Sequence, residues 1–271
     1  MNAAAGGMRP SARSRTGWTT ALVVVFAMVA AALPAAAGVG GKTAPPDSAE
    51  ACAVAPELLA SSYPLGRAAA RLAANKTLLV VVLGSASSLG RGVSSPAHAY
   101  PALLEKHLSS LLRGRISVVN RAAAGLTAPL AVGRIDADIL PLHPDLVVWE
   151  SGTTDVVKGV DLDDFGEAML AGLQKLYAAN IDVVLMDAQY SPQTAAMFNF
   201  DPYLDALHRV GEAADSVVFP RWEIMRTFAE DGRFDPAATT PGEQYRNADF
   251  IHGCIARLLA GQIAEAIKAK P

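Results

Sequence analysis

The sequence predicts an α/β fold, a three-layer α/β/α sandwich in which helices cover both faces of a five-stranded parallel sheet. Short apolar runs rich in β-branched residues alternate with segments of helical periodicity over residues 78–268, which is typical of parallel sheets. The first run, residues 78–83, contains only Leu and Val, and this suits a strand covered on both faces. Residues 38–271 are enough to bury one sizeable core, so we expect one domain.

The expected elements follow in chain order. After the 78–83 strand, Tyr100 and Pro101 begin a helix whose apolar residues recur every three or four positions to residue 112. The other expected strands are 116–119, 146–149, 181–186 and 216–219, and the other expected helices are 130–140, 162–179, 202–214 and 251–268. Trp149 falls on a central strand and is expected to lie in the core.

The first 37 residues have the layout of a secretory signal peptide. Three arginines precede an apolar run from Trp18 to Leu33, and small residues follow up to Ala37. We therefore expect residues 1–37 to be a signal peptide and the protein to be exported, either periplasmic or secreted. The alternative is an uncleaved N-terminal anchor, because roughly 20 apolar residues can span a bilayer. A membrane is an expected partner only in that case.

The remainder divides into a linker and N-terminal segment, 38–75, and a domain, 76–271. Residues 38 to about 60 are rich in Ala, Gly, Pro and Ser and lack periodicity, so they are expected to wrap onto the domain. The leader contains three of the 23 basic residues and none of the 26 acidic ones, so the part after residue 37 has a formal charge of −6. This mildly acidic balance argues against nucleic acid as a partner.

Cys52 and Cys254 are the two cysteines of the chain. In an exported protein a lone pair of cysteines can oxidise to one disulfide, which here would fasten the N-terminal segment beside His252. The alternative is two buried free thiols.

Candidate site residues gather where the expected strands end, because ligands of parallel sheets meet the loops at the carboxyl ends of the strands. Asp249 and His252 are expected in a loop before the last helix. The other segments at this edge are Gly84-Ser85-Ala86-Ser87-Ser88, Ala123-Ala124-Gly125 and Gly152-Thr153-Thr154-Asp155.

These four segments resemble the four blocks of the SGNH or GDSL hydrolases, and the resemblance runs from about Leu78 to Ile267. It is strongest for the exported branch whose first block reads Gly-Ser-Ser-Ser-Thr, since the run from Pro144 to Trp149 followed by Gly-Thr-x-Asp is similar too. The resemblance implies a flavodoxin-like strand order and hydrolysis of carboxylic esters. The implied substrate is a small-molecule or glycan ester, with an acyl or acetyl group on a carbohydrate or lipid.

The resemblance also implies roles for single residues. His252 would be the general base and Asp249 would orient it, while the backbone N–H of Gly125 would donate to the oxyanion. Two positions differ from the family pattern. Ala86 stands where the family has its nucleophilic serine, and Thr154 stands where an asparagine helps to stabilise the oxyanion.

These substitutions matter because acyl transfer needs a nucleophile, a base and oxyanion donors. An alanine methyl cannot attack, and losing one oxyanion donor costs about 10²- to 10³-fold in rate. Ser87 is the expected replacement nucleophile, with Ser85 and Thr154 contributing to oxyanion or substrate binding. The structural alternatives are that these serines cap a following helix and that Gly125 is a turn glycine with positive φ.

Three function classes stay open at this point: an ester hydrolase with a weakened site, a catalytically inactive relative that binds a glycan or envelope component, and a flavin-binding module, which would need phosphate-binding donors in the first loop. No metal or cofactor is expected. The five histidines show no metal-ligand spacing. The glycine-rich segment 84–92 lacks the phosphate-loop signature, because no lysine follows Gly90.

Overall fold

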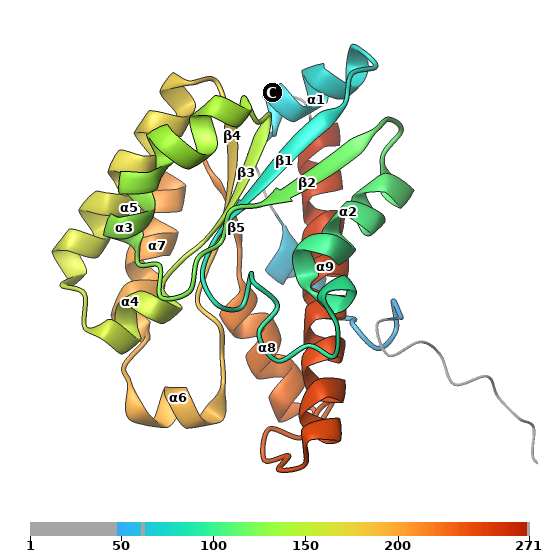
Figure 1. Ribbon diagram of the computed structural model, residues 1–271, viewed down its shortest axis with the longest axis vertical. Coiled ribbons are helices and arrows are strands. Elements are labelled where there is room, and N and C mark those ends of the chain that lie inside the picture. Colours follow the sequence, from blue (N-terminus) through green and yellow to red (C-terminus); the bar gives the residue numbers. More distant parts are fainter. Residues whose placement is uncertain (1–47, 61–62, 270–271) are drawn as a thin grey trace, which may run out of the picture. The chain divides into compact units, whose positions relative to one another are not determined.

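Five parallel strands form a single sheet in the computed structural model, which describes residues 48–60 and 63–269 (Figure 1). The strand order is β2-β1-β3-β4-β5, so the predicted fold class and flavodoxin-like order are confirmed. The described residues belong to the unit 44–271, and the predicted signal peptide lies outside them. The strands are β1 (Leu78–Leu83), β2 (Ile116–Asn120), β3 (Leu146–Glu150), β4 (Asp182–Met186) and β5 (Val217–Phe219).

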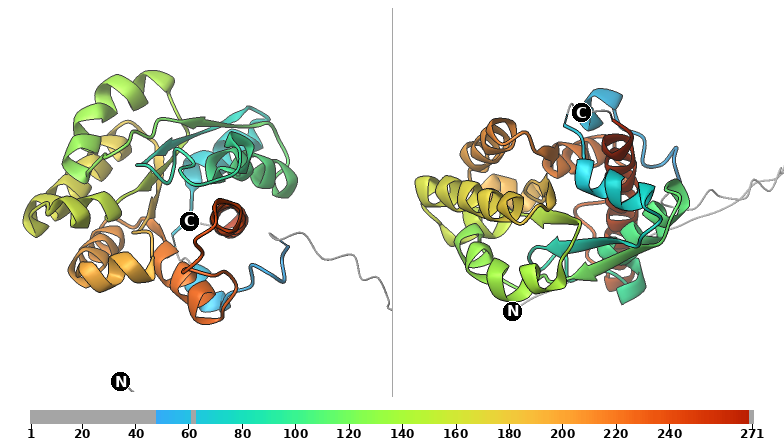
Figure 2. Two further views of the ribbon diagram at one scale, coloured as in Figure 1. Left: turned by 60° about the horizontal axis from the view of Figure 1, so that its bottom comes forward. Right: turned by 90° about the horizontal axis from the view of Figure 1, so that it is seen from above.

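Helices cover both faces of this sheet, and α5 and α9 lie on opposite sides of it (Figure 2). Short helices α4, α6 and α8 follow the carboxyl ends of β3, β4 and β5 (Figure 1). The α-helices are α1 (Gly66–Ala73), α2 (Tyr100–Leu111), α3 (Ala128–Arg134), α4 (Thr153–Lys158), α5 (Leu162–Ala178), α6 (Pro192–Met197), α7 (Asp201–Ala213), α8 (Arg221–Glu230) and α9 (Pro241–Lys268).

Each strand divides its side chains between two cores, because successive residues of a strand point to opposite faces. On β1, Val80 and Val82 pack with α1, α2, α8 and α9, whereas Val81 and Leu83 pack with α3, α5 and α7. Trp149 is fully buried in the second core, as predicted. A Cβ on Gly172 would lie 2.3 Å from the Trp149 ring, so only glycine lets α5 approach the sheet this closely.

Helix α9 begins at Pro241, ten residues before the predicted start at 251. The overlooked signal is a capping box: the Thr240 side chain accepts from Glu243 N, and Pro241 occupies the first turn. Asp249 and His252 therefore lie within α9, and their predicted place in a loop before the last helix is wrong. Among the described helices, α9 alone is long and apolar enough to cross a membrane by composition, but 72% of that stretch is buried in the described part.

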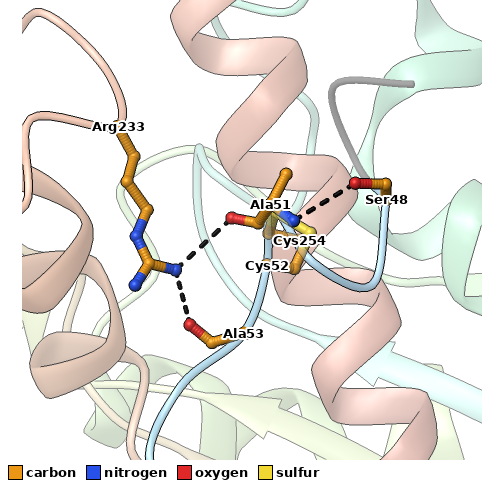
Figure 3. The surroundings of a disulfide bond; sticks show 6 residues. All are labelled: Ser48, Ala51, Cys52, Ala53, Arg233 and Cys254. Atoms are coloured by element: carbon orange, nitrogen blue, oxygen red, sulfur yellow. Dashed lines mark hydrogen bonds between the residues drawn. A yellow bond between two sulfur atoms is a disulfide. The ribbon is translucent and has the colours of Figure 1, made fainter. Parts of the chain in front are cut away.

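The segment between residues 48 and 75 is more ordered than the predicted linker. It contains a 3-10 helix, Pro56–Leu59, and helix α1, and it contributes Cys52, Leu65 and Ala68 to the core. A disulfide joins Cys52 to Cys254 on α9, so the predicted bridge is confirmed (Figure 3). Arg233 Nη1 also donates to the carbonyl oxygens of Ala51 and Ala53 (Figure 3).

Removing the disulfide should destabilise the protein strongly, because it closes a loop of 202 residues. We expect Cys52→Ser with Cys254→Ser to lower the free energy of unfolding by about 2–5 kcal/mol, measured by urea denaturation. Alkylation of the native protein without reductant should leave its intact mass unchanged. Labelling of both thiols would show that the bridge is absent from the purified protein.

Candidate active site

A pocket of about 330 Å³ opens at the carboxyl edge of the sheet. Ser87 from the loop after β1, Arg221 at the start of α8 and His252 on α9 all line it. Two of the predicted catalytic residues, Ser87 and His252, therefore share one pocket. The remaining lining residues are Arg91, Tyr100, Gln189, Tyr190, Ser191, Pro192, Gln193, Met225, Phe234, Asp235, Pro236, Ala238, Gln244, Asn247, Ala248, Ile251 and Ile255.

A buried ion pair lies beneath the pocket. Arg221 Nη2 is 3.1 Å from Glu150 Oε1, and the two side chains are 2% and 3% exposed. Burial alone would raise the pKa of Glu150, but the Arg221 charge and hydrogen bonds from Ser88 and from Ser85 N hold it below its ordinary value. The surroundings thus favour the ionised form of Glu150, which balances the Arg221 cation.

The three serines of the first block have three different partners. Ser85 Oγ lies 2.7 Å from Thr154 Oγ1, and Ser87 Oγ accepts from Arg221 Nη1 at 2.8 Å. Ser88 is fully buried and donates to Glu150. No described helix starts directly after this turn, since residues 86–92 form turns and the next helical residue is Pro96. The interpretation of these serines as helix caps is therefore wrong.

His252 is held in its neutral form. Its side chain lies in a nearly buried position, 8% exposed, and its Nδ1 accepts from the backbone N–H of Tyr100 at 3.0 Å. Burial, together with the Arg221 charge, lowers the pKa of His252 to about 4. Because Nδ1 accepts a hydrogen bond, the proton of the neutral ring is on Nε2.

Asp249 does not pair with His252 in this arrangement. Its carboxylate accepts from Ser94 N at 2.9 Å and from Ser94 Oγ at 2.6 Å, and lies 3.1 Å from His98 Nδ1. The two residues are one turn apart on α9. However, the Asp249 carboxylate is bound by Ser94 and His98, and Nδ1 of His252 accepts from the backbone N–H of Tyr100. The predicted orienting contact from Asp249 to His252 is thus not made.

The residues predicted to help the oxyanion lie outside the pocket lining. Gly125 has φ +73°, and its carbonyl oxygen accepts from Lys158 Nζ at 2.7 Å, which agrees with the turn-glycine alternative. Ser85 and Thr154 bond to each other. An oxyanion role for Gly125, Ser85 and Thr154 stays a prediction.

Sequence reasoning did not single out Glu150, Arg221 or Tyr100. The sequence positions of two of these residues could have indicated a site. Glu150 is the last residue of the buried strand β3, and Arg221 is the second residue after strand β5. A charged residue at the carboxyl end of a buried strand faces the edge where ligands bind. The sequence could not indicate Tyr100 in this way, because it is the backbone N–H of Tyr100, and not its side chain, that donates to His252. No group of three His, Cys, Asp or Glu residues suited to a metal occurs in the described part of the chain.

Comparison with known proteins identifies the family. Residues 51–269 match the sequence profile of the non-GDSL lipase-like family. The chain belongs to that family. This match confirms the resemblance to the SGNH hydrolases at the level of the family. Thioesterase 1/protease 1/lysophospholipase L1 of Escherichia coli is 31% identical over 129 residues, 48% of this chain and 59% of the relative, so the chain spans less than two thirds of that protein.

Solved structures of hydrolases share the fold of this non-GDSL lipase-like protein. A lipase/acylhydrolase from Enterococcus faecalis has a TM-score of 0.57 at 17% identity, over 72% of this chain and 99% of the other. A two-domain esterase active on acetylated mannans has a TM-score of 0.62 at 19% identity, over 78% and 55%. At these identities the likeness shows the fold alone.

Acid should destabilise the protein through His252. The folded pKa of about 4 lies below the ordinary 6.5, so the unfolded chain takes up this proton first as the pH falls. We expect the wild type to lose up to about 3 kcal/mol more than His252→Gln between pH 6.5 and 4. Urea denaturation of both proteins across this range measures the difference, and parallel curves would contradict it.

Breaking the buried ion pair should be far more costly than breaking an exposed one. Glu150→Gln leaves Arg221 as an unpaired buried cation, so we expect a loss of about 3–5 kcal/mol in the free energy of unfolding. The control is Asp136→Asn, which removes an exposed pair with Lys175 and should cost less than about 1 kcal/mol. Equal losses in the two variants would show that Glu150 and Arg221 are well solvated.

Proposed function

We propose that the protein is an exported hydrolase of carboxylic esters in which Ser87 replaces the missing nucleophile at Ala86. The observation that carries the proposal is that Ser87 and His252 line one pocket, with the Arg221 guanidinium donating to Ser87 Oγ. Family membership supports the reaction class. The disulfide supports export, because such bonds persist in oxidising compartments.

Arg221 favours attack by Ser87 electrostatically. A cation within hydrogen-bond distance stabilises the alkoxide that develops as Ser87 loses its proton, and burial makes this interaction stronger than in water. Thr153 Oγ1 and Glu150 hold the other guanidinium nitrogen, which fixes the direction of the donor to Ser87. Arg221 therefore has the place of an activating group beside the nucleophile.

The proton of Ser87 passes to His252 in this mechanism. The ring can accept at Nε2 only after its own proton has moved from there to Nδ1, which now accepts from Tyr100 N. The ring must therefore give up its hydrogen bond from Tyr100 N, and no carboxylate among the described residues is hydrogen-bonded to His252 to accept from the new Nδ1–H. The reaction is consequently slow compared with an intact Ser-His-Asp triad.

The pocket suits a modest acyl ester. Its volume is at the small end of the range for small-molecule sites, about 300–1,000 Å³. Met225, Phe234 and Ile255 provide apolar wall, while Gln189 and Asn247 provide amides. We propose an acyl or acetyl ester of a carbohydrate or lipid as the substrate, with the acyl group against the apolar wall.

A second candidate function is binding without turnover. It is favoured by the separation of Asp249 from His252, because a base without its orienting group loses most of its catalytic value. In this case the same pocket binds a glycan or envelope component and releases it unchanged. The two candidates differ in whether Ser87 is a reactive nucleophile.

Labelling with a fluorophosphonate probe separates them, because such probes modify activated serines. We expect peptide mapping of the purified protein to find label on Ser87, and we expect Ser87→Ala and His252→Ala to abolish both labelling and hydrolysis of a short-chain test ester to one background, since the two residues act as a unit. The matched control is His98→Ala, an exposed histidine outside the pocket, which should keep the label. Absence of label in the wild type would favour the binding protein.

A further inference from the structure

We propose that Ser87, Arg221 and His252 form a receptor for a carboxylate group, so that the pocket binds the free carboxylic acid of an acyl ligand. The inference deepens the proposed function because it rests on the same pocket. It does not require Ser87 to act as a nucleophile, so binding of an acid and cleavage of an ester can be tested separately.

The three side chains approach the pocket as hydrogen-bond donors. Ser87 Oγ already accepts from Arg221 Nη1, so its own hydrogen is available for a ligand. His252 uses Nδ1 as an acceptor from Tyr100 N, which leaves an N–H donor at Nε2. A group that only accepts hydrogen bonds complements such a set, and an ionised carboxylate is a group of this kind.

Arg221 retains unused donors. A guanidinium has five N–H groups, and the bonds to Ser87, Glu150 and Thr153 account for three of them. Nε is buried and has no partner among the described residues. A buried N–H without an acceptor costs free energy, and a ligand oxygen that accepted from the guanidinium would remove part of this cost. Hydrogen bonds from a charged donor to a carboxylate are also stronger than those between neutral groups.

The charge balance favours a monoanion. Glu150 already neutralises Arg221, so a bound anion must be stabilised by the free N–H and O–H donors of Arg221, Ser87 and His252. A carboxylate brings one negative charge to these donors and a phosphate dianion brings two. Because each uncompensated charge is expensive in a buried site, the carboxylate is a better occupant than the dianion. The apolar wall of Met225, Phe234 and Ile255 then contacts the acyl chain of the same ligand.

Calorimetric titration of the purified protein at pH 7 tests this, with hexanoate and the neutral hexanamide as probes. The two have similar shapes, but the amide carries N–H donors and no charge. We expect hexanoate to bind at least about 10-fold more tightly, and Arg221→Met to weaken hexanoate about 10- to 100-fold while changing hexanamide less than about threefold. Equal affinities for the two probes in the wild type would overturn the receptor.

Three controls keep the result specific. Arg91→Met removes an exposed arginine from the same pocket. If it weakened hexanoate binding as much as Arg221→Met does, the binding would depend on the general positive charge of the pocket and not on a specific receptor. If Arg221→Met fails to fold, Arg221→Met with Glu150→Gln and the single variant Ser87→Ala replace it. We expect a hexanoate loss of at least about threefold in Ser87→Ala, and no loss would count against the proposal.

A third titration uses inorganic phosphate as the ligand. Phosphate that binds more tightly than hexanoate and depends on Arg221 would overturn the choice of a carboxylate. The outcome is also separable from that of the proposed function. Probe label on Ser87 without hexanoate binding contradicts the receptor alone, and hexanoate binding without label contradicts the hydrolase alone.

Discussion

The buried contact between Glu150 and Arg221 organises the whole carboxyl edge of the sheet. It ties the end of β3 to the start of α8, two elements 71 residues apart in sequence. Arg221 extends this link to Ser87, and Glu150 extends it through Ser88 to Tyr100, whose backbone fixes the ring of His252. The loop after β1, the end of β3, the start of α8 and helix α9 therefore share one polar network, and removing Glu150 or Arg221 would leave its partner as an unpaired buried charge.

Most of the sheet could be predicted because parallel strands that are buried on both faces have sequences of uninterrupted apolar residues. β1 and β3 are the clearest cases. The short helix α6 was not predicted, because its signal is the local cap at Ser191 and not an apolar run. Helices α1 and α8 have no side-chain cap that could have marked their starts. The start of α9 is marked in the same way as that of α6, since its first three turns are mostly polar and only the cap at Thr240 signals them, whereas the apolar stripe begins later.

The site shows where sequence reasoning reaches its limit. Topology correctly led to the edge of the sheet, and it brought Ser87 and His252 to one pocket. The partner of Asp249 could not be inferred, because Ser94 is 155 residues away and competes for the carboxylate only once the loop after β1 rests on α9. Spacing of three residues on a helix establishes that two side chains are neighbours, but not that they are partners.

The bridge between Cys52 and Cys254 has a topological effect beyond rigidity. It converts the greater part of the chain, residues 52–254, into a covalent ring, and all five strands and helices α1 to α8 are part of this ring. A protease that cuts one exposed loop of this ring, for example beside Met197, would open the ring but release no fragment. A protein built in this way keeps its sheet and pocket residues in a single molecule after one cleavage, for as long as its surroundings remain oxidising.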